Sequence, residues 1–199
     1  LAHSVARVKA AREGLAENID IMCDAHGTFS VAEARRFCRE VAECNIGWLE
    51  EPVVADDKRG MAEVRASSDV PISTGESEFT RFAFRDLAEL RACDIFQPDL
   101  SICGGITEAM RIEAIASAYQ LRYAPHLWGG ALTFAAGLQT MVVASTGFIV
   151  EYSLGANPML HELAVEDFTV VDGHLDVPDR PGLGVTVDED FVEKYRVKN

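Results

Sequence analysis

The chain has 199 residues, of which 48% are hydrophobic and 25% are charged, and it contains no apolar run long enough to span a membrane. Acidic residues outnumber basic residues by 32 to 18, which gives a formal net charge of −14. Because this charge repels polyanions, we expect no nucleic-acid partner, and we expect no membrane partner either. The composition is typical of one soluble globular unit.

Five cysteines lie in or beside apolar segments, without a CxxC pair or a spacing typical of zinc sites. An odd number of cysteines leaves at least one free thiol in a monomer. The first residues, LAHSVARVKAAREGL, lack the hydrophobic stretch of a secretory signal. These features predict reduced thiols and a cytoplasmic location.

Residues 2–17 are rich in Ala, Arg, Lys and Glu and predict a helix, and the apolar run that follows predicts a buried strand ending at Asp24. The next helix is expected to start at Ser30, because Glu33 lies three positions later and the two form a capping-box pattern. The apolar residues that end at Glu50 predict the second strand.

The same unit recurs four more times. The expected helices lie near 57–67, 81–91, 105–119 and 131–145, and each precedes an apolar strand segment: PISTGE, DIFQPD, LRYAPH and FIVEY. Six strands that alternate with helices predict an α/β fold with parallel strands and helical crossovers. After residue 151 the turn signals predict loops and short strands, followed by a helix at 188–195.

One ionisable residue closes each predicted strand, at intervals of 23 to 27 residues. In a (β/α)8 barrel the carboxyl ends of the strands converge on one mouth, so these side chains are expected to face a common pocket. The alternative is that strands often end in Asp or Glu because loops begin there. The six residues are Asp24, Glu50, Glu76, Asp99, His126 and Glu151.

Three of these strand ends, Asp24, Glu50 and Glu76, are consecutive carboxylates, which offer the hard oxygen ligands that Mg2+ prefers. Without a cation, three neighbouring negative charges would repel one another. Glu51 follows Glu50 directly, and on an extended strand the two point to opposite sides, so only one can face the pocket. We expect Glu50 to be the ligand and Glu51 to be either a loop residue or a group that lies behind the ligands and supports them.

His126 follows Asp99 by one unit, where a carboxylate can hold the imidazole and raise its basicity, as suits a general base. The alternative for His126 is a packed, hydrogen-bonded histidine without a chemical role. His26 lies two residues after Asp24, so both side chains point into the mouth if the strand stays extended. It is either a second acid/base or a loop histidine.

The strings DAHG, WLEEP, TGE, QPDLSICGGITE, APHLWGGAL and VEY, in this order and spacing, resemble the mandelate racemase branch of the enolase superfamily. The resemblance covers roughly residues 19–185 and implies a (β/α)8-type barrel, incomplete here with about six of eight βα units. It divides the chain into a partial barrel over 1–155 and, over 156–199, a segment that returns to a capping domain. The N-terminal capping domain and the first barrel strands are missing from the pattern.

The resemblance also implies roles for single residues. It places the Mg2+ ligands on Asp24, Glu50 and Glu76, a His-Asp dyad on His126 and Asp99, and on Glu151 the carboxyl group that hydrogen-bonds the substrate carboxylate. It implies removal of the proton next to that carboxylate, with Mg2+ stabilising the ene-diolate. The implied substrate is a small hydroxy-carboxylate, and the implied assembly is a homo-oligomer.

The histidine at position 26 resembles that of the galactonate and mannonate dehydratases, where it protonates the departing hydroxyl group. We therefore expect a hydro-lyase that converts an acid sugar (an aldonate) to a 2-keto-3-deoxy acid. One alternative is a racemase or epimerase of a 2-hydroxy acid that uses the same metal. Another is a catalytically incomplete fragment that serves as a subunit or a binding module.

Overall fold

The structure is a computed structural model, and it describes residues 1–197. Helices and strands alternate along the first two thirds of the chain, as the sequence predicts. These elements are α1 (Ala2–Gly14), β1 (Ile21–Asp24), α2 (Val31–Glu40), β2 (Ile46–Glu50), α3 (Lys58–Ala66), β3 (Ile72–Thr74), α4 (Thr80–Glu89), β4 (Ile95–Phe96), α5 (Gly105–Ala118), β5 (Arg122–Tyr123) and α6 (Ala131–Val143).

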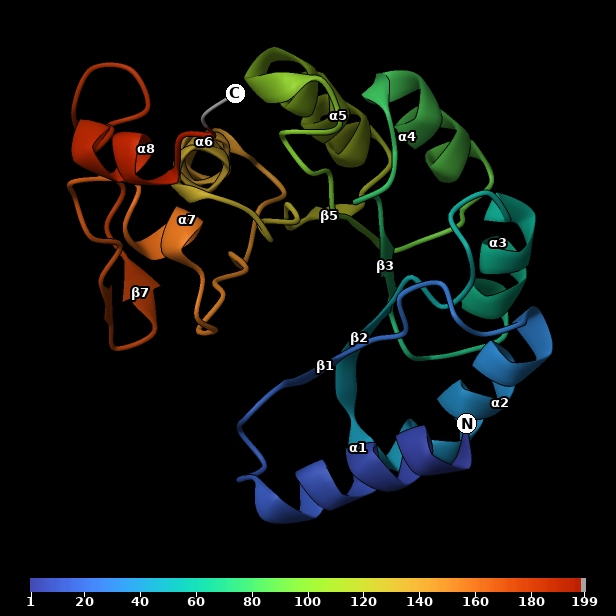
Figure 1. The fold of residues 1–199 in the computed structure, drawn as a ribbon. Helices are drawn as coiled ribbons and strands as arrows, with labels where there is room; N and C mark the ends of the chain where they lie inside the picture. Colours follow the sequence, from blue (N-terminus) through green and yellow to red (C-terminus); the bar gives the residue numbers. More distant parts are fainter. Residues whose placement is uncertain (198–199) are drawn as a thin grey trace.

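The five strands form one sheet in the order β1-β2-β3-β4-β5, and every neighbouring pair is parallel. Figure 1 shows the strands along the inside of an arc, with α2 to α6 on its outer side. This confirms the predicted α/β fold class. Because consecutive strands are neighbours and all run in one direction, their carboxyl ends lie along the same rim of the arc.

The prediction of a sixth strand that ends at Glu151 is wrong. Its segment makes a single parallel bridge, between Tyr123 and Gly147, and no ladder. The turn before this bridge is held by a side chain instead, because a Glu113 carboxylate oxygen accepts hydrogen bonds from Ser145 Oγ at 2.8 Å and Thr146 N at 3.2 Å. The next three residues belong to neither a helix nor a strand.

Local sequence signals account for several helix starts. The Ser30 hydroxyl accepts a bond from Glu33 N at 3.3 Å while the Glu33 carboxylate accepts one from Ser30 N at 3.0 Å, so the predicted capping box is present. Asp57 caps α3 in a similar way by accepting a bond from Gly60 N at 2.8 Å. Between the helices and the sheet lies a continuous apolar core that includes Met61, Phe84 and Ile112.

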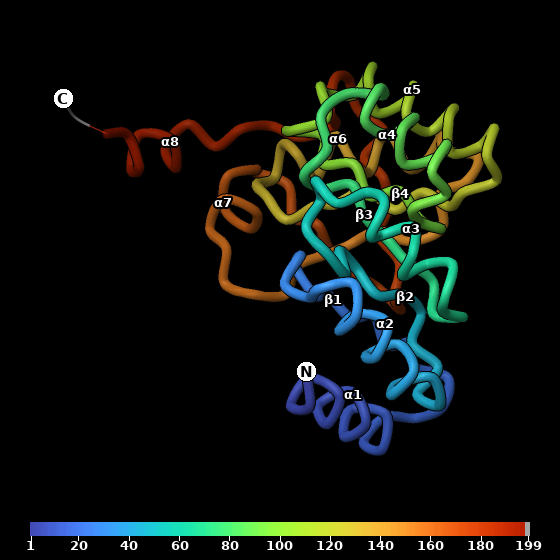
Figure 2. Tube along the Cα trace, turned by 90° about the vertical axis from the view of Figure 1, so that its right-hand side faces the viewer, coloured from blue at the N-terminus to red at the C-terminus, as the bar shows by residue number. Residues whose placement is uncertain are grey.

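Much of the chain after residue 151 packs beside α6 (Figure 1), whereas its last helix, over residues 189–195, projects from the rest of the molecule (Figure 2). Tyr152 Oη donates a hydrogen bond to the carbonyl of Phe168 at 2.9 Å, and the Phe168 ring lies edge-on to Phe134 of α6, 4.7 Å between centroids. The elements of this last part are α7 (Pro158–His161), the antiparallel pair β6 (Val170–Val171) and β7 (His174–Leu175), and α8 (Glu189–Tyr195).

Within residues 1–197, none of the helices has both the length and the apolar character that crossing a bilayer demands.

Candidate active site

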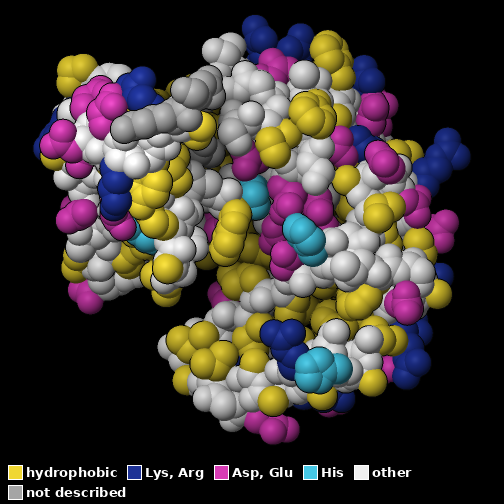
Figure 3. Space-filling model, in the orientation of Figure 1, with side chains coloured by type: hydrophobic (Ala, Val, Ile, Leu, Met, Phe, Trp, Pro, Cys, Tyr) yellow, Lys and Arg dark blue, Asp and Glu magenta, His cyan; other side chains and the backbone are white. Residues whose placement is uncertain are grey.

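The rim formed by the carboxyl ends of the strands brings the predicted residues together. In the register of the sheet Asp24 pairs with Glu50, and Glu50 pairs with Ser73, three residues before Glu76. Asp99 follows β4 and His126 follows β5 by three residues each. Figure 3 shows acidic side chains gathered beside histidines near the centre of one face of the molecule.

The closest contact between two side chains of this set joins His126 to Asp99, with 2.8 Å between His126 Nδ1 and Asp99 Oδ2. The other oxygen of Asp99 accepts hydrogen bonds from the backbone N–H of Ser101, at 2.7 Å, and from its hydroxyl. Although burial disfavours the ionised carboxylate, the hydrogen bonds from His126 and Ser101 lower the pKa of Asp99. Asp99 is therefore a fixed, ionised partner of the imidazole.

The second ring nitrogen of His126 faces the acidic cluster, which consists of Asp24, Glu50, Glu51 and Glu76. Its Nε2 lies 3.7 Å from Glu76 Oε2. Burial favours the neutral ring, but the hydrogen bond to Asp99 and the charges of Glu76 and Glu151 outweigh it and raise the pKa of His126 to about 9. The ring is thus oriented through Nδ1, and Nε2 is available for chemistry at the mouth.

His26 approaches Glu76 from the other side. Its Nδ1 lies 4.0 Å from Glu76 Oε1 and 3.9 Å from Asp24 Oδ2. The residue has a positive φ of 49°, so the chain leaves the extended conformation directly after the strand. The two oxygens of one carboxylate, Glu76, therefore face the imidazoles of His26 and His126.

Glu50 and Glu51 both belong to this acidic cluster. Burial, followed by the charge of Asp24, raises the pKa of Glu50 to about 7, although hydrogen bonding from Gln97 and Trp48 opposes the shift. Burial, followed by the charge of Glu76, raises the pKa of Glu51 to about 7. Each carboxylate therefore sits in a partly dry region of negative potential.

Glu51 lies in the loop directly after β2, as expected, and its carboxylate also reaches the acidic cluster. Glu51 is 5% exposed, and a positive φ of 36° interrupts the strand's alternation there. One group of three potential ligands in the described part of the chain has all its ligand atoms within 4.8 Å of one another, and it consists of His26, Glu51 and Glu76. It shares only Glu76 with the predicted ligand set.

Asp24 is not part of that group, and its carboxylate makes a local contact instead. Its Oδ1 accepts a hydrogen bond from the backbone N–H of His26 at 2.7 Å, and half of the side chain is exposed. Asp24 and Glu50 nevertheless lie opposite each other in the sheet, and both influence the pKa of Glu51. The assignment of Asp24, Glu50 and Glu76 as metal ligands stays a prediction.

The residues present fit a divalent cation. Glu51 Oε1 is buried without a hydrogen-bond partner, as is Gln97 Oε1. Within residues 1–197, the acidic cluster (Asp24, Glu50, Glu51 and Glu76) makes ion-pair contacts with His26 and His126 but with no Lys or Arg side chain. A set of carboxylate oxygens with uncompensated charge is the ligand chemistry that Mg2+ prefers.

Glu151 reaches the same rim although it lies outside any strand. Its Oε2 accepts a hydrogen bond from the backbone N–H of Leu127 at 2.7 Å, next to His126. A cavity of about 260 Å³ lies between Glu151 and Glu50. Its lining includes Met22, Trp48, Glu50, Gln97, Pro125 and Glu151.

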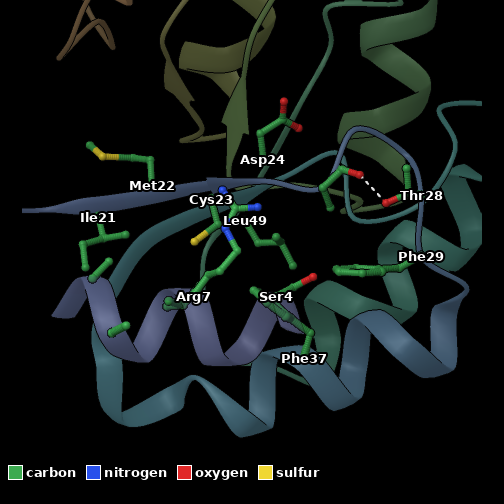
Figure 4. Close-up of a pocket in the computed structure, with 14 residues that line it drawn as sticks. Ser4, Arg7, Ile21, Met22, Cys23, Asp24, Thr28, Phe29, Phe37 and Leu49 are labelled. Carbon is green, nitrogen blue, oxygen red and sulfur yellow. Dashed lines mark hydrogen bonds between the residues drawn. The ribbon is translucent and has the colours of Figure 1, made fainter. Parts of the chain in front are cut away.

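A second cavity, of about 540 Å³, lies on the other side of β1, against α1. Figure 4 shows Arg7 and Cys23 on the α1 side of the strand, whereas the side chains of Met22 and Asp24 point to the opposite side. This follows from the alternation of side chains along a strand. The carboxylate of Asp24 is thus directed toward the rim and away from the larger cavity.

Comparison with known proteins gives a consistent match. The family described as enolase C-terminal domain-like matches residues 1–191. A D-galactarolactone cycloisomerase from Agrobacterium fabrum is 32% identical and a D-galactonate dehydratase from Xanthomonas oryzae pv. oryzae is 34% identical, each over 96% of this chain and 52% of the relative. The chain therefore spans about half the length of the curated relatives that it matches.

Solved structures show the same fold. The 3,6-anhydro-D-galactonate cycloisomerase from Zobellia galactanivorans superimposes with a TM-score of 0.94 at 30% identity, covering 99% of this chain and 56% of that one. A mandelate racemase/muconate lactonizing enzyme-like protein from Rubrobacter xylanophilus gives a TM-score of 0.90 at 32% identity, covering 98% of this chain and 50% of that one.

Proposed function

Because the chain belongs to the enolase C-terminal domain-like family, we propose that its rim site removes the proton next to a substrate carboxylate and dehydrates an acid sugar. The observation that carries this proposal is the His126–Asp99 pair, whose contact of 2.8 Å leaves Nε2 facing the acidic cluster. Such a dyad is suited to general base chemistry. The proposed substrate class is an aldonate, since several relatives are named as dehydratases of D-galactonate or D-xylonate.

In the proposed reaction His126 Nε2 takes the proton from C2 of the aldonate, and Asp99 stabilises the imidazolium that results. The electrons of the broken C–H bond first move into the substrate carboxylate, and in a second step they return to form the C2–C3 double bond as the C3 hydroxyl leaves. His26 donates a proton to that hydroxyl, so that water departs, and the remaining enol becomes a 2-keto-3-deoxy acid. Glu151 is proposed to hydrogen-bond the substrate carboxylate from the other side of the cavity.

We propose Mg2+ as the cation, with Asp24, Glu50 and Glu76 as its ligands. When bound, a divalent ion supplies positive charge that stabilises the developing anion on the substrate and favours the neutral His126 ring that a base requires. His26 and His126 lie on either side of Glu76, which supports His126 as the base and His26 as the acid.

The test uses the full chain, Mg2+ and D-galactonate as the first probe in D2O, with the C2 proton followed by NMR and keto acid detected with semicarbazide. His126→Asn should abolish loss of the C2 proton and keto-acid formation together. His26→Asn should reduce keto-acid formation while exchange at C2 continues. Keto acid formed by His126→Asn at the unsubstituted rate, or inversion at C2 without keto acid, would contradict the proposal.

A further inference from the structure

A tryptophan on β2 contacts one of the carboxylates at the rim. The indole Nε1 of Trp48 donates a hydrogen bond to Glu50 Oε2 at 3.1 Å. The two residues are separated by one position on the same strand, so their side chains leave the sheet on the same face. Both also line the cavity of about 260 Å³ between Glu50 and Glu151.

The indole ring of Trp48 also contacts a residue near β5, the last strand of the sheet. Its ring lies edge-on to Phe148, at an interplanar angle of 86° and a centroid distance of 6.1 Å. Phe148 follows the bridge between Tyr123 and Gly147 beside β5, and its ring carries the guanidinium group of Arg122 at 3.2 Å. The curvature of the sheet thus brings residues next to β5 onto a side chain of β2, which limits the rotamers open to Trp48.

An uncharged hydrogen-bond donor suits the position beside Glu50. A Lys or Arg beside Glu50 would neutralise part of the acidic cluster and compete with a cation. An indole N–H carries no net charge, so it orients the carboxylate while leaving its negative charge available. Outer partners of this kind fix the direction of metal-binding side chains, and their loss typically lowers metal affinity about 10- to 100-fold.

We propose that Trp48 is a positioning residue, whose N–H holds Oε2 of Glu50 and thereby sets the direction of its second oxygen for cation binding. This inference rests on the proposed function, because it takes Glu50 as a ligand of Mg2+. Trp48 acts through Glu50 and contributes no atom to the reaction.

The test measures Mg2+ affinity by isothermal titration calorimetry in the full chain. Trp48→Phe keeps an aromatic ring against Phe148 and removes the N–H, and it should weaken Mg2+ binding about 10-fold or more. The matched control is Phe148→Leu, which loses the edge contact but keeps the indole N–H. It should change the affinity less than Trp48→Phe does.

A spectroscopic signal gives a second readout. The chain contains two tryptophans, and Trp128 is 65% exposed. In Trp128→Phe the emission comes from Trp48 alone, and it should change with Mg2+ at the same dissociation constant that calorimetry gives. An emission that does not respond to Mg2+ would contradict contact between Trp48 and a metal-binding carboxylate.

The outcomes separate this inference from the proposed function. If the unsubstituted chain does not bind Mg2+, the metal assignment of the proposed function fails, and this inference fails with it. If the unsubstituted chain binds Mg2+ and a folded Trp48→Phe binds it equally well, only the role of Trp48 is overturned. If Trp48→Phe does not fold, benzothienylalanine at position 48 removes the N–H while keeping the two-ring shape, and unchanged affinity in that protein overturns the inference.

Discussion

His126 Nδ1 lies 2.8 Å from Asp99 Oδ2, and the opposite ring nitrogen lies 3.7 Å from Glu76. The ring is therefore held at one nitrogen and directed into the acidic cluster at the other. Ser101 holds Asp99 in turn, through its backbone N–H and its hydroxyl. This chain of contacts fixes the orientation of the proposed base before any substrate binds.

Asp99→Asn should lower the rate of C2 proton removal about 100-fold or more, because a neutral amide stabilises the imidazolium less and can reorient the ring. The measurement is loss of the C2 proton of D-galactonate in D2O at saturating Mg2+. Ser101→Ala is the matched control, since it removes one hydrogen bond to Asp99 and keeps the charge, and it should have a smaller effect. A rate for Asp99→Asn equal to that of the unsubstituted chain would exclude Asp99 as the partner of the base.

The two possible ligand sets at the rim make different predictions for Mg2+ affinity. If Asp24, Glu50 and Glu76 are the ligands, Glu50→Gln should weaken binding more than about 100-fold, beyond what outer partners contribute. Glu51→Gln should weaken it less, because that change removes only a nearby negative charge.

Calorimetric titration of the two variants with Mg2+ distinguishes these sets, with Asp24→Asn as the third comparison. A large loss in Glu51→Gln together with an unchanged affinity in Asp24→Asn would instead assign the ion to the group of His26, Glu51 and Glu76.

The sequence predicts the location of the site because of a regularity of parallel sheets. Because the βα units are similar in length, each strand ends next to the end of the strand before it, on the same rim. Asp24 and Glu50 are therefore expected to be neighbours, and the structure pairs them. The contact of His126 with Asp99 follows from the same regularity, since the two residues end neighbouring units.

What the sequence does not reveal depends on single backbone angles and on distant contacts. The alternation rule places Glu51 away from the pocket, but it holds only while the backbone is extended, and Glu51 has a positive φ of 36°. The hydrogen bond from Trp48 to Glu50 could be suspected from their spacing on one face of a strand. The contact of Trp48 with Phe148 depends on sheet curvature, which no local pattern encodes.

A glycine in α6 is required by the packing under the rim. A Cβ at Gly137 would lie 2.9 Å from Leu127 Cδ1 and closer still to Cδ2, and Leu127 is fully buried. Gly137→Ala should therefore destabilise the fold by about 1–3 kcal/mol through overpacking. It should also lower activity, because the backbone N–H of Leu127 holds Glu151.

Gly14→Ala is the matched control for this change, since a Cβ there meets nothing within 4 Å at the end of α1. Relative to glycine, alanine favours a helix by up to about 1 kcal/mol, so Gly14→Ala should be neutral or stabilising. Urea unfolding of both variants provides the comparison. Equal midpoints for Gly137→Ala and Gly14→Ala would contradict the assigned contact with Leu127.

The start of α4 is joined to α5 by a single carboxylate. Glu108 Oε1 accepts hydrogen bonds from the backbone N–H of Arg81 at 2.9 Å and from its guanidinium group at 2.8 Å, and Oε2 accepts one from Arg111 at 2.9 Å. The bond from the Arg81 backbone, followed by the bonds from the arginine side chains, lowers the pKa of Glu108 from 4.5 to about 2.

This shift predicts how stability depends on pH. A carboxylate whose pKa is lower in the folded state stabilises the fold above its unfolded value of 4.5, and that contribution is lost as the pH falls toward about 2. Glu108→Gln should therefore have a lower urea midpoint than the unsubstituted chain at neutral pH, and the difference should narrow below about pH 4.5. Glu89→Gln, at an exposed position of α4, serves as the control and should change the midpoint little at any pH. A difference for Glu108→Gln that stays constant from neutral pH to about pH 3 would show that its ion pairs do not contribute through charge.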